Sequence, residues 1–132
     1  MRRLVLTIGA ILPLASLSLA SPAPAADDRF MRSLQMLDPV DRLEQLCDYA
    51  AMKEIRKDHK DFRPDRAVAG NEPRIKGDTI EAKDGAFRSR KKWYVLSYTC
   101  TAAPDHLSVT SFQYKIGEEI PEAKWASYGL WE

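Results

Sequence analysis

Two cysteines, Cys47 and Cys100, constrain this 132-residue chain more than any other feature of its sequence. Cys47 falls on the apolar stripe of a predicted helix, and Cys100 ends an aromatic-rich predicted strand. They do not form the Cys-x-x-Cys spacing that is typical of redox or metal sites. In an oxidising compartment an even number of cysteines indicates disulfide pairing. We therefore expect a Cys47–Cys100 disulfide, with a free or catalytic thiol as the alternative.

The N-terminus predicts such a compartment. Arg2 and Arg3 precede an apolar run from Leu4 to Leu19, which is shorter than the roughly 20 apolar residues that span a bilayer. The small residues of Ala23-Pro24-Ala25 then resemble a cleavage site. We predict a signal peptide at residues 1–25, ordinary secretion, and a periplasmic mature protein with no stable membrane anchor. An uncleaved anchor is the alternative.

The charge balance limits the class of partner. The whole chain has 20 basic and 19 acidic residues. Removal of the signal peptide takes away Arg2 and Arg3, so 18 basic residues remain against 19 acidic ones. A nearly neutral domain lacks the positive field of a general nucleic-acid binder. We expect no nucleic acid among its partners.

Local patterns predict one helix followed by a sheet. Asp38 is typical of an N-cap and Pro39 of the first helical position, and apolar residues then recur at helical spacing to about Lys57. From Ala67 onward, short β-branched and aromatic runs alternate with turn residues. The predicted fold class is α+β, with this helix packed on a twisted antiparallel β-meander and a short C-terminal helix over 121–128.

The mature chain is predicted to be one domain. Residues 26–37 form an N-terminal arm of one or two helical turns, and residues 38–132 form a single disulfide-stapled domain. A chain of about 107 residues buries only about two-thirds of its unfolded surface, so a covalent link matters for its stability. The outer face of the main helix, which includes Glu44 and Asp48, is expected to be solvated.

Two turn signals set the expected strand register. Gly77-Asp78 and Asp84-Gly85 both suit two-residue hairpin turns. With both turns formed, Glu81 lies opposite Arg74 on one side and opposite Arg88 on the other.

The sharpest surface feature is a basic hairpin tip beside an aromatic residue. The candidate binding residues are Arg88, Arg90, Lys91, Lys92 and Trp93. Cationic groups of this kind could hold an anionic polymer or a lipid headgroup. The alternative is an ordinary charged loop whose lysines discourage pairing of strand edges.

Few residues suggest catalysis or metal binding. His59 and His106 are the only histidines, and each has acidic neighbours. His106 follows Pro104-Asp105, so a turn role competes with a general-base role. The chain has no Gly-x-Ser-x-Gly or His-Glu-x-x-His motif, and with both cysteines oxidised it lacks the ligands of a typical zinc site. We expect no catalytic residue, no metal and no cofactor.

Several segments of the chain resemble one known family. They are Leu37-Asp38-Pro39, Arg42 to Asp48, Phe62 to Arg66, Ala86-Phe87-Arg88, Trp93-Tyr94, Cys100 and Pro104-Asp105-His106. Together they resemble an alphaproteobacterial family of exported proteins that is classed only as a domain of unknown function. The likeness spans nearly all of the mature chain. It implies export, and it implies no activity, cofactor or site residue.

The leading functional hypothesis is therefore a non-enzymatic periplasmic interaction module. It binds an envelope component or a periplasmic protein through an exposed sheet face or through the basic hairpin. One alternative is a small-ligand or lipid carrier that holds an apolar molecule between helix and sheet. A less favoured alternative is a hydrolase that uses His106 with Asp105. The sequence does not indicate the oligomeric state.

Overall fold

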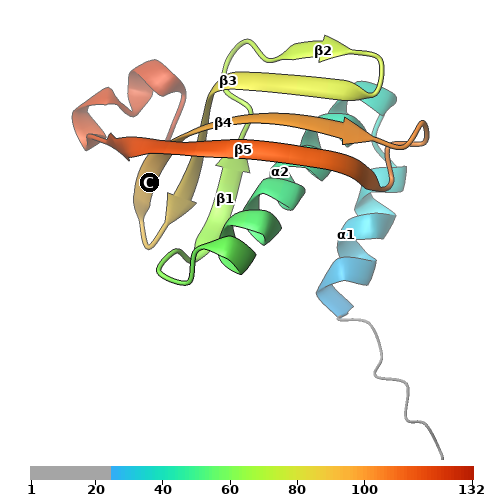
Figure 1. Ribbon diagram of the computed structural model, residues 1–132, viewed down its shortest axis with the longest axis horizontal. Coiled ribbons are helices and arrows are strands. Elements are labelled where there is room, and N and C mark those ends of the chain that lie inside the picture. Colours follow the sequence, from blue (N-terminus) through green and yellow to red (C-terminus); the bar gives the residue numbers. More distant parts are fainter. Residues whose placement is uncertain (1–24) are drawn as a thin grey trace, which may run out of the picture.

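The structure, a computed structural model, describes residues 25–132 (Figure 1). The predicted signal peptide lies outside the described residues, apart from Ala25. The elements are α1 (Ala25–Gln35), α2 (Pro39–Asp58), β1 (Pro64–Val68), β2 (Arg74–Lys76), β3 (Thr79–Ser89), β4 (Lys92–Ala102), β5 (Val109–Ile120) and the 3-10 turns η1 (Glu122–Lys124) and η2 (Ala126–Tyr128). The fold is α+β, as predicted. None of the helices in this range has the length and apolar character needed to cross a membrane.

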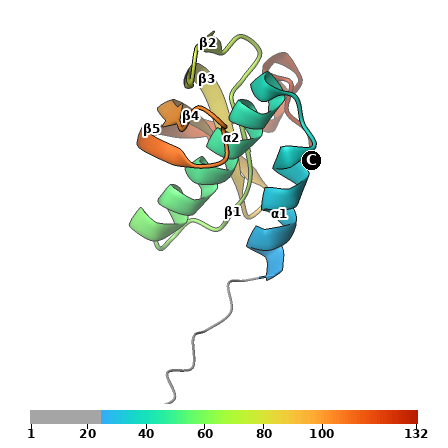
Figure 2. The same ribbon diagram turned by 90° about the vertical axis from the view of Figure 1, so that its right-hand side faces the viewer.

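The antiparallel sheet has the strand order β1-β3-β4-β5, and β2 pairs with the same edge of β3 as β1 does. Figures 1 and 2 show α2 lying across one face of this sheet, with α1 beside it. The main core fills the space between α2 and the sheet. It includes Leu34, Leu43, Leu46, Cys47, Ile55, Ile80, Phe87, Leu96, Tyr98 and Cys100.

The helix α2 begins where its sequence predicts. The Asp38 side chain accepts a hydrogen bond from the backbone N–H of Asp41 at 3.3 Å, which satisfies one of the free donors at the helix N-terminus. Pro39 occupies the first turn, where no partner for its nitrogen is needed. At the other end, the backbone N–H of His59 donates to the carbonyl of Ile55 at 2.8 Å.

The predicted N-terminal arm is an 11-residue helix, α1. Its Leu34 side chain is fully buried in the main core. The rings of Phe30 on α1 and Tyr49 on α2 lie 4.1 Å apart. The arm is therefore part of the packed structure from its first turns.

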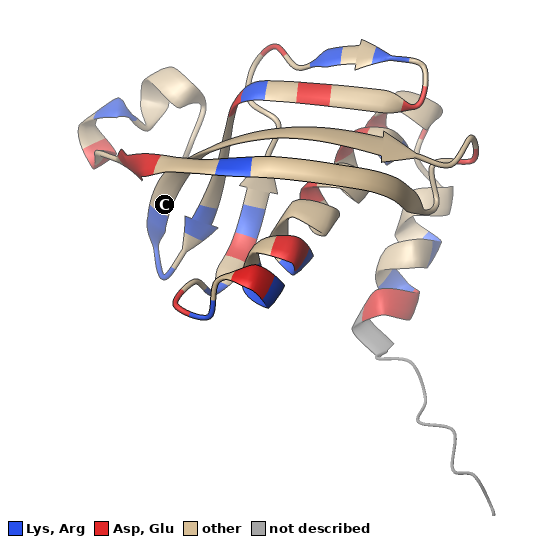
Figure 3. Cartoon of the chain, in the orientation of Figure 1, with Lys and Arg blue, Asp and Glu red and all other residues tan. Residues whose placement is uncertain are grey.

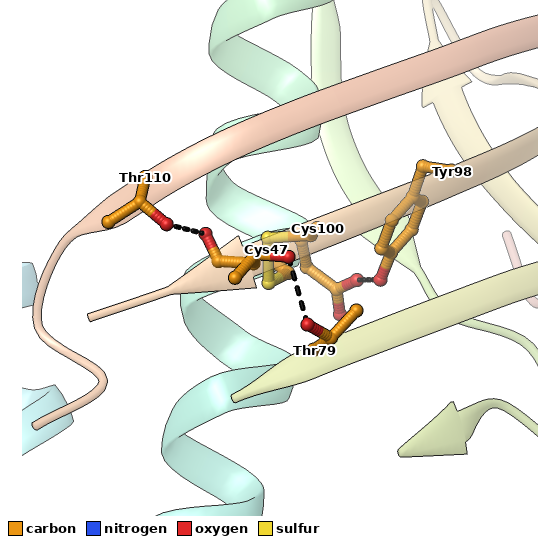
Figure 4. The surroundings of a disulfide bond; sticks show 7 residues. Cys47, Thr79, Tyr98, Cys100 and Thr110 are labelled. Atoms are coloured by element: carbon orange, nitrogen blue, oxygen red, sulfur yellow. Dashed lines mark hydrogen bonds between the residues drawn. A yellow bond between two sulfur atoms is a disulfide. The ribbon is translucent and has the colours of Figure 1, made fainter. Parts of the chain in front are cut away.

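The Cys47–Cys100 disulfide is confirmed (Figure 4). Its two Cα atoms are 6.0 Å apart, and both residues are fully buried. The bond joins the middle of α2 to β4, a central strand of the sheet. It therefore fixes the helix layer to the sheet layer at the centre of the core.

Of the two predicted hairpin turns, one is confirmed and one is wrong. Gly77-Asp78 connects β2 to β3, with Arg74 opposite Glu81. In contrast, β3 continues without a break through Asp84 and Gly85, and no turn forms there. Its register with β4 shifts between Ala82 and Gly85.

The reason for this error is close packing at Gly85. A Cβ atom on Gly85 would lie 2.8 Å from the carbonyl oxygens of both Leu96 and Val68. The glycine is therefore needed for the approach of three strands. As a consequence, Arg88 lies opposite Trp93 of β4 and not opposite Glu81.

The C-terminal segment covers the other face of the sheet at one end. The predicted helix over 121–128 is a pair of short 3-10 turns, η1 and η2. A second, smaller core on this face contains Ala86, Trp93, Ile120 and Leu130. The chain end thus closes an apolar patch that the meander alone would leave exposed.

Candidate functional site

The basic hairpin predicted as a binding site is the turn between β3 and β4. Its two central residues, Arg90 and Lys91, have φ values of 51° and 66°. Both are exposed. This is the left-handed region, which suits the twist of a two-residue hairpin but disfavours residues other than Gly, Asn and Asp.

The cations that flank this turn are paired with acids. The Arg88 guanidinium donates to both carboxylate oxygens of Asp65, at 3.0 and 2.9 Å, and its side chain is only 14% exposed. These hydrogen bonds hold the pKa of Asp65 below its ordinary value. Lys92 lies 3.6 Å from Glu119. Figure 3 shows this mixture of basic residues at the turn and acidic residues at the end of β5.

The fifth predicted residue, Trp93, is 0% exposed. Its indole N–H donates to the carbonyl of Trp131 at 2.8 Å, and the Arg88 guanidinium lies 5.8 Å from its ring centre. Trp93 therefore belongs to the second, smaller core and is not on the surface. Of the four predicted cations, Arg90 and Lys91 alone have no ion-pair partner within residues 25–132.

A surface hollow of 510 Å³ lies beside the turn. It is lined by Asp65, Arg88, Lys91, Glu122, Trp125 and Glu132. Carboxylates and cations thus share this surface, and the hollow lacks the single-sign field that would select a polyanion.

His106 is buried and has no ring nitrogen free for a substrate. Its Nδ1 lies 2.7 Å from the carbonyl oxygen of Pro39, and its Nε2 lies 2.9 Å from a carboxylate oxygen of Asp78. Both partners are acceptors. With φ at 55°, His106 is a left-handed turn residue that connects the β4–β5 loop to the start of α2 and to the β2–β3 turn.

The second histidine, His59, is exposed at the end of α2. Its ring packs edge-on against Phe62 and Tyr114. In the part of the chain that the structure describes, no three His, Cys, Asp or Glu side chains gather as a metal site requires.

The sequence patterns missed a buried carboxyl, Asp48. It was expected on the solvated face of α2, but it is buried beside the disulfide and accepts a hydrogen bond from the Tyr98 hydroxyl at 2.9 Å. Burial raises the pKa of Asp48 to about 7. Burial, together with Asp48, also raises the pKa of Tyr98, so its hydroxyl stays protonated and donates. Figure 4 shows Tyr98 beside the two cysteines.

The free edge of the sheet is formed by β5. This 12-residue strand pairs only with β4 among the described strands, and Figure 2 shows it at the border of the sheet. Its first half, residues 109–114, has no charged side chain. From Ser111 to Ile116 its register with β4 is regular. The register also shifts between Val109 and Ser111. The uncharged part of this edge that pairs regularly with β4 is therefore Ser111 to Tyr114.

The second half of β5 carries the features that normally protect a sheet edge. Lys115, Glu118 and Glu119 supply charges, and the register with β4 shifts between Ile116 and Glu119. Pro121 follows directly after the strand. The unprotected stretch, which is uncharged and regularly paired, is thus confined to the four residues from Ser111 to Tyr114.

A groove of 440 Å³ lies next to this unprotected stretch. It is lined by Met31, Leu46, Tyr49, Ala50, Lys53, Glu54, Val109, Thr110, Ser111 and Phe112. The residues from α1 and α2 are mostly apolar or aromatic, with one cation and one acid among them. The Phe112 ring stacks on that of Tyr98, with 5.4 Å between their centres. Backbone edge and apolar groove together can hold an extended polypeptide.

Sequence reasoning did not single out this edge. Its signal was present in the uncharged run from Val109 to Tyr114, which contrasts with the charged residues that follow. The strand order, which decides that β5 and not another strand lies at the border, depends on long-range pairing.

The region from the last residues of α1 to the end of the C-terminal turns coincides with a known family model. The model, described as Domain of Unknown Function (DUF930), matches residues 34–130. No curated protein and no solved structure matches the chain.

Proposed function

This protein belongs to the DUF930 family of domains of unknown function, and from that premise we propose that it is an exported, periplasmic and non-enzymatic interaction module. It binds a protein partner that adds an extended segment to the edge of β5. The observation that carries this proposal is the uncharged first half of β5, which pairs regularly with β4 from Ser111 onward, beside the 440 Å³ groove.

Backbone chemistry supports strand addition at this edge. The outer side of an edge strand presents N–H and C=O groups that have no partner within the sheet, and another strand satisfies them. Side chains of the added strand alternate between the two faces of the sheet. Those on the helix side would enter the groove beside Phe112, which is half-buried.

Two features support export to the periplasm. The first is the charged start and apolar run of residues 1–25, which have the character of a signal peptide. The second is the buried disulfide, because such bonds persist in oxidising compartments.

The other hypotheses have weaker support. An envelope polyanion would meet only Arg90 and Lys91 as unpaired cations at the hairpin, with acids close by. A lipid carrier needs space between helix and sheet, where Leu43, Ile80 and Leu96 are fully buried. A hydrolase that uses His106 would need a free ring nitrogen.

The test is cross-linking inside cells from a photoreactive residue placed at Ser111 in the full-length chain. Lys83 is the control position because it is exposed but lies on β3, two strands away from the edge. We expect specific protein adducts from position 111 and none from position 83. The cross-linked segment, made as a peptide, should then slow amide hydrogen exchange within 110–116. Equal adducts from both positions, or none from position 111, would contradict the proposal.

A further inference from the structure

We infer that the segment added to β5 is β5 of a second copy of this chain, paired antiparallel across a two-fold axis at Gln113. This inference rests on the proposed function, because it names the occupant of the same edge. A two-fold axis perpendicular to the sheet joins the two sheets into one and leaves both α2 helices on the same side.

Charge favours self-pairing at this register. A pair centred on Gln113 places Lys115 of each copy opposite Ser111 of the other. Lys115 is the only charged residue within 109–117, so no like charges face each other. A pair centred two residues later would oppose the two Lys115 side chains, which destabilises a sheet.

Side chains on the helix side also match. Phe112 and Tyr114 are both half-buried and face α2, where their rings lie 5.9 Å apart. At the proposed register, Phe112 of each copy lies opposite Tyr114 of the other, so two aromatic pairs form across the new boundary. Aromatic pairs directly opposite one another stabilise antiparallel strands. The 440 Å³ groove beside Phe112 gives these rings space to pack.

A second copy is a better occupant than a flexible peptide for an entropic reason. Each β5 is already an ordered strand, held by its pairing with β4. A disordered segment must lose backbone freedom when it adds to the edge, whereas a folded strand has already lost it. Two copies of the uncharged edge can therefore pair with little further loss of backbone entropy.

The experiment combines the mass in solution with site-specific disulfide formation in the purified protein. Gln113→Cys is compared with Thr99→Cys, because Thr99 lies directly opposite Gln113 on β4 and is also exposed. In the proposed dimer, the two Cβ atoms at position 113 lie about 5 Å apart. The two copies of position 99 are separated by three strand spacings, about 14 Å, which a disulfide cannot span.

We expect a dimer by analytical ultracentrifugation at protein concentrations between about 1 μM and 1 mM. The Gln113→Cys protein should form covalent dimers and the Thr99→Cys protein should not. Gln113→Lys should shift the protein to a monomer because it opposes two cations, whereas Thr99→Lys should leave the mass unchanged.

Two results would overturn the inference: a monomer at every concentration, or a dimer that tolerates Gln113→Lys and fails to cross-link through position 113. A monomer in solution whose Ser111 position still cross-links to another protein in cells would overturn the second copy alone and leave strand addition intact. Loss of both signals would refute both proposals.

Discussion

At the scale of single residues, the buried carboxyl of Asp48 links protonation to stability. In the unfolded chain the pKa of this group has its ordinary value of 3.8, and in the folded chain burial raises the pKa to about 7. Between these values the folded state binds a proton that the unfolded state has released. Stability from this group is therefore full at low pH and is lost as the pH rises to about 7.

We predict that Asp48→Asn removes this loss. The free energy of unfolding of each protein is measured by urea unfolding at about pH 4 and pH 7. Over this interval, the wild-type protein should lose at most about 4 kcal/mol more than the variant does. Asn keeps an oxygen that accepts the Tyr98 hydroxyl hydrogen bond without a titrating charge. The exposed Asp61 offers a control, since Asp61→Asn should retain the wild-type slope. Parallel pH profiles for wild type and Asp48→Asn would contradict the prediction.

The buried location of Asp48 also explains what residue patterns could and could not predict. A charged residue at the border of an apolar stripe is normally solvated, and only the position of Tyr98 on β4 shows that this one has a buried partner. The same holds for Trp93, because the carbonyl that receives its N–H comes from Trp131, 38 residues later. Partners this distant in sequence have no local signal.

At the scale of elements, the β3–β4 hairpin keeps two bulky cations in a conformation that suits Asn-Gly. Left-handed backbone geometry costs an ordinary residue about 1 kcal/mol or more. We predict that the double change Arg90→Asn and Lys91→Gly raises the free energy of unfolding by about 1 kcal/mol. Urea unfolding at neutral pH measures it.

The same double variant separates stability from binding at the hairpin. It removes the two unpaired cations without disturbing the Arg88–Asp65 pair. If partner cross-linking at Ser111 survives in the stabilised variant, the basic hairpin is not needed for that contact. A destabilised variant would instead mean that Arg90 or Lys91 makes contacts that offset the cost of their backbone geometry.

Helices and turns could be predicted from the sequence where interactions between nearby residues determine their ends. The start of α2 is determined by an N-cap and a proline that act within a few residues of each other. The Gly77-Asp78 turn likewise connects strand residues that are close in sequence. Asp84-Gly85 has the same composition as a turn but lies where three strands meet. Turn composition could not separate these two cases. The free edge of β5 likewise follows from strand order, which no local pattern contains.

At the scale of the whole molecule, one covalent bond joins the two layers. The cysteines are 53 residues apart in sequence. In the chain-entropy model, closing such a loop lowers the entropy of the unfolded chain and so raises the free energy of unfolding by about 4 kcal/mol. We predict that Cys47→Ala with Cys100→Ala lowers the free energy of unfolding by about that amount. Urea unfolding with and without a reducing agent measures it.

In that measurement, reduction should lower the stability of the wild-type protein toward that of the double variant and should not affect the variant. Such a loss is large against the roughly 5–15 kcal/mol that holds a typical domain together. A double variant as stable as the oxidised protein would show that the unfolded chain is restricted in some other way.

The position of the disulfide also decides how the molecule would respond to mechanical tension. If the chain were pulled from its two ends, force would pass from α2 to β4 through the covalent bond. The strands β1, β2 and β3 lie between the two cysteines in sequence, so this loop would bear no load. Only the parts outside the loop, α1, β5 and the C-terminal segment among them, could be drawn out. The strand that offers the free edge is thus the strand that a pull on the C-terminus would reach first after the terminal turns.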